Sequence, residues 1–189
     1  MVPQRIFVDA DVLASRTQYL WLTLLREEAG DWFQLHSSSD VVVDAVQAWV
    51  GRDPVARADA ASRRLESLAA SLDEVVGVFA DIGVPRGVSK GASVHDAAAT
   101  GAHVLLTSQV PDSAGVDDLP FEIYTPDQFF CLVDDGAASR VRGAARQYDH
   151  RTRRPARGGA VESLTEALAA ADCPGFAERV STHLRASVH

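Results

Sequence analysis

Apolar residues along the chain fall into short continuous runs separated by longer stretches with helical spacing, a pattern typical of α/β proteins. Short apolar runs predict strands, here at residues 5–8, 33–36, 103–107 and 121–124. Stretches with apolar residues three and four apart predict helices, at about residues 13–29, 41–50, 54–72, 94–100, 126 onward, 161–171 and 175–186. Short strands that alternate with helices predict an α/β fold with a parallel sheet and covering helices.

Charge is unevenly distributed along the chain, which has a net charge of -8 and a pI of about 5.1. Between Gly136 and Gly158 seven arginines outweigh one aspartate and give +6, so the remaining residues carry -14. These arginines are Arg140, Arg142, Arg146, Arg151, Arg153, Arg154 and Arg157. Such a segment either binds nucleic-acid phosphates locally or is a solvated linker. We expect a domain at residues 1–135, an Arg-rich linker at 136–160 and a C-terminal helical extension at 161–189.

Length and cysteine content favour one globular domain in a reducing compartment. The chain has 189 residues, of which 47% are hydrophobic, enough to build a core. Cys131 and Cys173 lie far apart in the sequence, and neither has a partner at metal-ligand spacing. The N-terminal apolar run is too short for a secretory signal, and no apolar stretch approaches the roughly 20 residues of a membrane-spanning helix. We therefore expect a cytoplasmic protein.

Two aspartates are candidates for chemistry. Asp9 ends the first strand and is followed by Asp11, and ligands of parallel sheets gather at the carboxyl ends of strands. Mg²⁺ and Mn²⁺ prefer carboxylate oxygens, which makes Asp9 a candidate metal ligand; the other interpretation is that it caps the following helix. Asp44 interrupts the apolar stretch 41–46 and faces either a polar site or solvent.

Several segments resemble the bacterial PIN-domain family. The opening run Phe7-Val8-Asp9-Ala10-Asp11-Val12-Leu13 resembles the first strand and helix of PIN domains. Residues 38–46, with Asp44, resemble their second acidic helix, and residues 101–107 resemble their third block. Residues 119–129 and 173–180 are similar to the closing strand and the tail of a bacterial PIN subgroup. The resemblance covers nearly the whole chain and implies a PIN-like three-layer α/β sandwich, with a central parallel sheet and helices on both faces.

This resemblance implies a Mg²⁺- or Mn²⁺-dependent ribonuclease. The family holds one or two divalent ions in a pocket of three or four carboxylates, and such ions can generate the nucleophilic water and stabilise the leaving oxygen. Asp9 and Asp44 match the first two acidic positions. Many members are toxins of toxin–antitoxin pairs, so the implied partners are RNA and a small antitoxin protein.

The chain departs from the family pattern at the other two acidic positions. Lys90, the only lysine, stands at the third position, and Ser108 and Gln109 stand at the fourth. Asp96 and Asp112 are nearby candidates to complete the metal shell; their alternative roles are helix capping and solvation. The same departures motivate a second hypothesis, that the chain is a catalytically degenerate PIN domain that binds RNA or a protein.

A third hypothesis is a phosphatase of the haloacid dehalogenase type. Residues 7–12 are similar to its Asp-x-Asp nucleophile motif, residues 105–108 to its second motif and residues 132–135 to its acidic fourth motif. The position of Lys90 before the second motif argues against it, because that family places its lysine afterwards.

Two remaining features suggest structure rather than chemistry. His95 and His103 are eight residues apart and match no short metal-binding motif, so we expect structural roles for both. The C-terminal helices are expected either to cover the acidic site or to form a homodimer contact.

Overall fold

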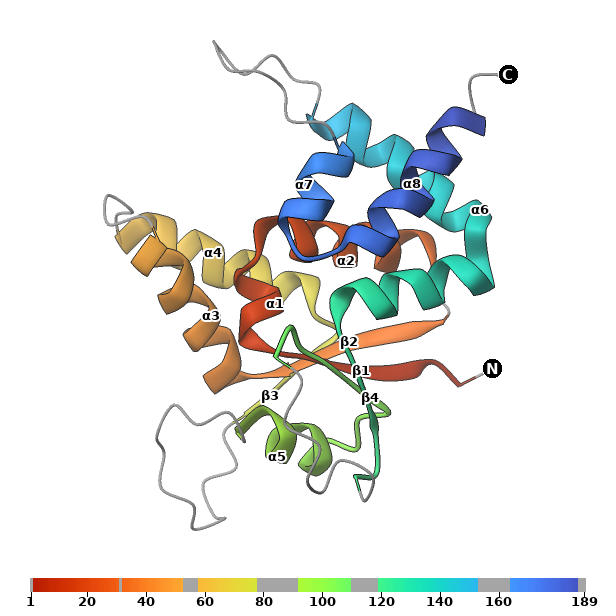
Figure 1. Ribbon diagram of the computed structural model, residues 1–189. Helices are drawn as coiled ribbons and strands as arrows, with labels where there is room; N and C mark the ends of the chain where they lie inside the picture. Colours follow the sequence, from red (N-terminus) through yellow and green to blue (C-terminus); the bar gives the residue numbers. More distant parts are fainter. Residues whose placement is uncertain are drawn as a thin grey trace. The chain divides into compact units, whose positions relative to one another are not determined.

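The computed structural model describes residues 2–30, 32–52, 58–77, 92–109, 119–152 and 164–186. Its strands are β1 (Gln4–Val8), β2 (Phe33–Ser38), β3 (Glu74–Val76), β4 (Val104–Leu106) and β5 (Glu122–Tyr124). All pairings are parallel, and the order across the sheet is β3-β2-β1-β4-β5 (Figure 1). The predicted α/β class with a central parallel sheet flanked by helices is confirmed.

The described helices divide between two compact units. The first unit comprises Met1–Ala14 and Trp32–Thr125, and the second comprises Ser15–Asp31 and Pro126–His189. Helices of the first unit are α1 (Ala10–Ala14), α3 (Ser39–Arg52), α4 (Ala58–Ser71) and α5 (Ala92–Ala99). Helices of the second unit are α2 (Arg16–Glu28), α6 (Pro126–Thr152), α7 (Leu164–Ala170) and α8 (Pro174–Ala186). None of these described helices combines the length and the apolar character needed to cross a membrane.

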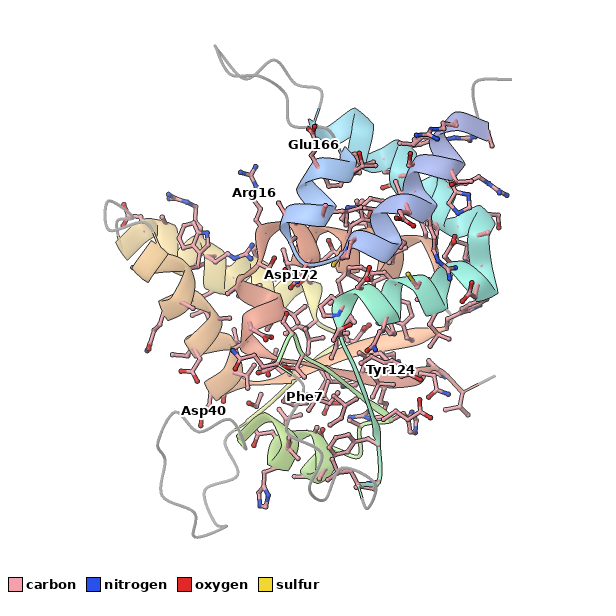
Figure 2. The ribbon with its side chains drawn as sticks, in the orientation of Figure 1. Phe7, Arg16, Asp40, Tyr124, Glu166 and Asp172 are labelled. Atoms are coloured by element: carbon pink, nitrogen blue, oxygen red, sulfur yellow. The ribbon has the colours of Figure 1, made fainter. Side chains whose placement is uncertain are left out.

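The core of the first unit is the sheet itself. Ile6, Phe7 and Val8 of β1 are all 0% exposed, and Phe7 lies within the sheet in Figure 2. Continuous apolar strands are expected where helices cover both faces of a parallel sheet. Figure 1 shows α5 on one side of this sheet and α1, α3 and α4 on the other. This layering leaves the carboxyl ends of the strands as the place where polar side chains can gather.

Two local features of the fold differ from the sequence prediction. The short edge strand β3 was not predicted, because three residues show too little periodicity to identify a strand. The helix predicted at about residues 13–29 is instead two helices, α1 and α2, separated at Ser15. Ser15 has extended backbone angles, and its hydroxyl accepts from the backbone N–H of Gln18, so it is the N-cap of a new helix.

The predicted Arg-rich linker is also partly wrong. Helix α6 continues through residues 136–152, which the sequence assigned to the linker. Its one irregularity is Ala137, whose φ of -148° and ψ of 48° are not helical. Beyond this break the helix buries Val141, Ala144 and Ala145, each 0% exposed, together with Tyr148. Burial of an apolar face keeps this polar segment helical; linker residues 153–160 lie outside the described residues.

Aromatic side chains form the core of the second unit. Trp21 of α2 stacks on Tyr148 of α6, with ring centroids 5.4 Å apart. Phe176 of α8 meets Trp21 edge-on at 5.0 Å and Phe130 at 5.2 Å. Stacked and edge-to-face pairs at these distances are favourable beyond their burial. These rings therefore join α2, α6 and α8.

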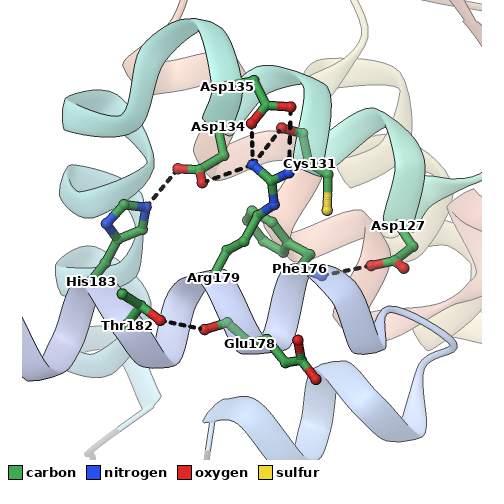
Figure 3. Close-up of polar contacts among 9 residues, drawn as sticks. All are labelled: Asp127, Cys131, Asp134, Asp135, Phe176, Glu178, Arg179, Thr182 and His183. Atoms are coloured by element: carbon green, nitrogen blue, oxygen red, sulfur yellow. Dashed lines mark hydrogen bonds and ion pairs between the residues drawn. The ribbon is translucent and has the colours of Figure 1, made fainter.

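A polar network fixes α8 against α6 within the same unit (Figure 3). The buried carboxylate of Asp134 lies 2.6 Å from Nε2 of His183 and 3.3 Å from Nη1 of Arg179. Arg179 also pairs with Asp135. A buried carboxylate needs such partners, because an unpaired charge in the interior is strongly unfavourable. The network therefore fixes the register of the two helices.

The N-terminus of α8 is capped by a residue from α6. Asp127 accepts hydrogen bonds from the backbone N–H groups of Gly175, at 3.2 Å, and Phe176, at 2.8 Å. Figure 3 shows the bond from Phe176. These N–H groups have no partner within their own helix, and a carboxylate there is favoured by the helix dipole. Pro174 at the first helical position needs no such partner.

Candidate functional site

The candidate site lies where the order of the sheet changes direction. Strands β1 and β4 are neighbours, although two strands (β2 and β3) and four helices (α1, α3, α4 and α5) of the same unit lie between them in the sequence. Ligands of open α/β sheets bind at such a switch point, beyond the carboxyl ends of the strands. Asp9 directly follows β1, and Thr107 directly follows β4. The backbone N–H of Asp9 bonds to the carbonyl of Leu106 at 3.0 Å, which holds the two strand ends together.

Two carboxylates meet at a single hydroxyl group. The hydroxyl of Thr107, a residue 2% exposed, donates to Oδ2 of Asp9 at 2.9 Å and lies 3.5 Å from Oδ2 of Asp11. Asp11 also accepts from the backbone N–H of Ser108 at 2.9 Å. Since a hydroxyl has one proton, the shorter contact to Asp9 takes it, and Asp11 accepts instead from the backbone N–H groups of Ser108 and Val12. We call Asp9, Asp11 and Thr107 the Asp9–Asp11 cluster.

The Asp9–Asp11 cluster concentrates negative charge. Burial, and secondly the negative charge of Asp9, raise the pKa of Asp11 above its ordinary value, although hydrogen bonds from the backbone N–H groups of Ser108 and Val12 act in the opposite direction. Two carboxylates at one place disfavour each other's ionisation. A cation near both would remove this repulsion, so the arrangement is suited to binding positive charge.

Asp44 extends the negative charge onto α3. Partial burial, and then the charges of Asp40 and Asp9, raise the pKa of Asp44, although its side chain is solvent-exposed. Asp40, at the first turn of α3, also projects to solvent (Figure 2). The two acidic positions predicted from the sequence, Asp9 and Asp44, are therefore close enough to influence each other electrostatically.

Asp96 reaches the same edge of the sheet from α5. Its Oδ2 accepts a hydrogen bond of 2.7 Å from the hydroxyl of Ser38, the last residue of β2. Because Phe7 pairs with His36, Ser38 lies beside Asp9 in the continued register of β1 and β2. Asp96 thus stands one strand away from the Asp9–Asp11 cluster, where its partner is a hydroxyl and not another acid.

Of the other residues considered through the PIN-domain resemblance, Ser108 and Gln109 are described by the structure and two are not. Ser108 and Gln109 are exposed, and their backbone N–H groups bond to Asp11 and to the hydroxyl of Thr107. At this position the chain therefore offers backbone donors where the family has an acid. Lys90 and Asp112 lie outside the described residues.

The predicted nucleic-acid-binding arginines lie in the second unit. The guanidinium of Arg140 donates to the carbonyl of Glu28 at the end of α2, so Arg140 helps to join α2 and α6. Arg142 is half-buried and Arg146 is exposed on α6. The backbone of Arg151 belongs to the last turn of α6. The remaining members, Arg153, Arg154 and Arg157, lie outside the described residues. Nucleic-acid binding by this segment stays a prediction.

The structure also locates the two histidines and the Asp134-Asp135 pair noted in the sequence. Nδ1 of His103 accepts from the backbone N–H of Arg5 at 3.0 Å, and His95 is exposed on α5. The Asp134-Asp135 pair, which the phosphatase hypothesis needs at a strand end, lies inside helix α6 and pairs with Arg179. This placement removes the acidic fourth motif from the phosphatase hypothesis.

The Asp9–Asp11 cluster would hold a divalent ion only as a site with few protein ligands. Within the described ranges, no three His, Cys, Asp or Glu side chains gather closely enough to form a metal-binding group. Mg²⁺ commonly keeps several waters and takes only one or two carboxylates, with substrate phosphates supplying other oxygens. Two carboxylates that converge on one hydroxyl satisfy this requirement.

We expect the Asp11→Asn substitution to raise the melting temperature of the metal-free protein near pH 7. The pKa of Asp11 is raised in the folded state, so its ionised form destabilises the fold at pH values above that pKa. Asparagine keeps an oxygen acceptor for the N–H of Ser108 but carries no charge. Thermal unfolding should show the rise, together with a smaller stabilisation by Mn²⁺. Glu66→Gln, an exposed change on α4, should do neither, and an unchanged Mn²⁺ response in Asp11→Asn would contradict the expectation.

Sequence reasoning did not identify Thr107 and Ser38 as members of this region. Each is a hydroxyl residue at or just beyond the end of a buried strand, which is the only local signal that pointed to them. Their partners, Asp9 and Asp96, are 98 and 58 residues away in the sequence.

Comparison with protein-family models, with curated proteins and with solved structures gives no match to this chain.

Proposed function

We propose that this chain is a divalent-metal-dependent ribonuclease with a PIN-like fold. The observation that carries the proposal is the convergence of Asp9 and Asp11 on the hydroxyl of Thr107 at the switch point of an all-parallel sheet. The charge of Asp9 also acts on Asp44, the second acidic position of the resemblance. Carboxylates at this position of a sheet are suited to holding Mg²⁺ or Mn²⁺ against a phosphodiester.

The roles of the residues follow from their contacts. Asp9 and Asp11 would hold the ion, and Asp44, Asp96 or Asp112 would supply a further acid. A bound divalent ion would supply a water of lowered pKa and stabilise charge on the leaving oxygen. Thr107 orients Asp9 through its hydrogen bond, and the N–H of Ser108 orients Asp11. Arginines of the 140–157 segment would bind backbone phosphates of the RNA.

Metal binding by this site should weaken in acid. The raised pKa values of Asp11 and Asp44 mean that protons compete with the ion at a higher pH than for ordinary aspartates. Carboxylates must be ionised to bind the ion, so binding releases any protons they hold. Affinity is therefore expected to fall as the pH falls through these raised pKa values.

Binding and cleavage can be tested separately with purified protein. At Mn²⁺ about a hundredfold above its dissociation constant, binding to the native state would stabilise it by about 2.7 kcal/mol. That corresponds to a rise in melting temperature of roughly 5–10 °C for a chain of this size. Incubation with single-stranded RNA and Mn²⁺ should then give cleavage products that a chelator prevents. Absence of both the thermal rise and the cleavage would defeat the proposal.

The second candidate is a PIN-like module that binds RNA or a protein without cleaving. The observation that favours it is the absence of a third acid, His or Cys beside the Asp9–Asp11 cluster among the described residues. It predicts binding of RNA, measured by fluorescence anisotropy, that is independent of Mn²⁺. A Mn²⁺-dependent increase in affinity together with cleavage would exclude it.

The remaining partners are proposals that follow from the resemblance. If the chain is a toxin, a small antitoxin protein would inhibit the cleavage described above. A homodimer contact through the C-terminal helices is a separate proposal, which sedimentation of the purified chain would test.

A further inference from the structure

A buried histidine occupies the sheet of the first unit. His36 of β2 is 3% exposed, and its Nδ1 lies 3.1 Å from Oε2 of Glu74 on the edge strand β3. The same oxygen accepts from Nη2 of Arg5 on β1 at 3.0 Å. Since an ionised carboxylate only accepts hydrogen bonds, Nδ1 of the neutral imidazole carries the proton and Nε2 carries the lone pair.

Nε2 of His36 is poorly placed to receive a proton. It is buried and has no hydrogen-bond partner in the described part of the chain. Burial and secondly the charge of Arg5 lower the pKa of His36, while Glu74 and Asp73 act in the opposite direction. These are the charged groups that face the imidazole from β1 and from the start of β3. The carboxylate of Asp96 on α5 bonds instead to Ser38.

The contacts of His36 connect two elements at the margin of the unit. Strand β3 has only three residues, and Glu74 is the one that pairs with His36 in the ladder. Arg5, which shares the carboxylate of Glu74, also donates to the carbonyl of Thr100, just after the end of α5, at 3.3 Å. Short edge elements with few ladder bonds open at low free energy. Strand β3 is therefore joined to the sheet partly through Glu74, which contacts His36, and the end of α5 is joined to it partly through Arg5, which shares the Glu74 carboxylate.

We propose that His36 is an acid-sensitive latch: a proton on its buried Nε2 releases β3 and α5 from the sheet. Opening hydrates the new N–H, which otherwise has no acceptor. Movement of α5 also withdraws Asp96 from Ser38, beside the Asp9–Asp11 cluster. The latch depends only on the fold of the first unit and holds whether or not the chain cleaves RNA.

The sign of the pH effect follows from linkage. In the closed state the pKa of His36 lies below its ordinary value of 6.5, so the open state binds the proton first as the pH falls. The contribution of His36 to opening therefore grows as the pH falls from about 6.5 to the lowered pKa, and stays constant below it. At pH values well above 6.5, His36 does not affect opening. One proton changes the opening equilibrium by at most about tenfold per pH unit.

Amide hydrogen exchange of the full chain tests the latch. After correction for intrinsic rates, we expect exchange in β3 and α5 to accelerate several-fold between about pH 7.5 and about pH 5.5, while β1 and β4 change little. His36→Gln, which can still donate to Glu74 but takes no proton, should lose this acceleration. His95→Gln, an exposed histidine change on α5, should retain it.

A second measurement uses the wild-type protein, so it tests the latch even if the His36→Gln protein does not fold. The imidazole signals of His36 in the wild-type NMR spectrum should titrate below pH 6.5 and report an Nδ1–H tautomer at neutral pH. Titration of His36 at or above its ordinary value would overturn the latch. So would equal acceleration of exchange in all strands, or an acid response that persists in a folded His36→Gln protein.

Discussion

We expect the Asp9→Asn substitution to reduce Mn²⁺-dependent RNA cleavage by at least about a hundredfold, equivalent to about 2.7 kcal/mol of transition-state stabilisation. Asp9 accepts from the hydroxyl of Thr107 and stands beside Asp11, so its charge is central to the Asp9–Asp11 cluster. Asparagine keeps the shape and an oxygen acceptor but removes one of the few charges that could hold the ion. Single-turnover cleavage of a labelled RNA at saturating Mn²⁺ measures the loss.

The matched control is Glu66→Gln, which also converts a carboxylate to an amide but lies exposed on α4. Its cleavage rate should stay within about twofold of the wild type, because exposed substitutions away from the site have small effects. Circular dichroism of Asp9→Asn should match the wild type, which separates lost chemistry from lost folding. A folded Asp9→Asn protein with the wild-type rate would sink the nuclease proposal.

The Phe176→Ala substitution is expected to destabilise the second unit by about 3–5 kcal/mol. Phe176 is 0% exposed, and its ring centroid lies 5.0 Å from that of Trp21 and 5.2 Å from that of Phe130. Its backbone N–H is also one of the two groups that Asp127 caps, so the ring and the helix start are fixed together. Urea unfolding followed by tryptophan fluorescence, in a background with Trp32→Phe and Trp49→Phe that leaves Trp21 alone to fluoresce, reports the change, because Trp21 lies in the same cluster.

Two controls distinguish the lost ring from a general sensitivity of the helices. Phe176→Leu keeps most of the volume and should cost about 1 kcal/mol. Leu132→Ala, on α6 with 50% of its surface exposed, should change stability by less than about 0.5 kcal/mol. Similar losses for Phe176→Ala and Leu132→Ala would show that the aromatic cluster does not determine the stability of this unit.

Local sequence patterns were sufficient to predict a strand or helix where a segment's own residues determine its conformation. The apolar run that ends at Asp9 predicted β1, and the helices predicted from residue 126 and over residues 175–186 correspond to α6 and α8. The α/β class followed from the alternation of short predicted strands with predicted helices. By contrast, β3 and the helical part of residues 136–152 depend on partners distant in the sequence, so no local pattern identified them.

The sequence by itself determined that an aspartate would stand at the carboxyl end of a central strand, because strand polarity and an apolar run fix that place. Only the tertiary structure decided which side chains surround it. Thr107 reaches Asp9 and Asp11 because β4 crosses to the far side of β1, and Asp96 bonds to Ser38 because α5 packs near the end of β2. The same is true of His36, whose neighbours Arg5 and Glu74 come from the strands on either side. Such pairings depend on strand order, which parallel crossovers set over long sequence separations and which short-range periodicity does not encode.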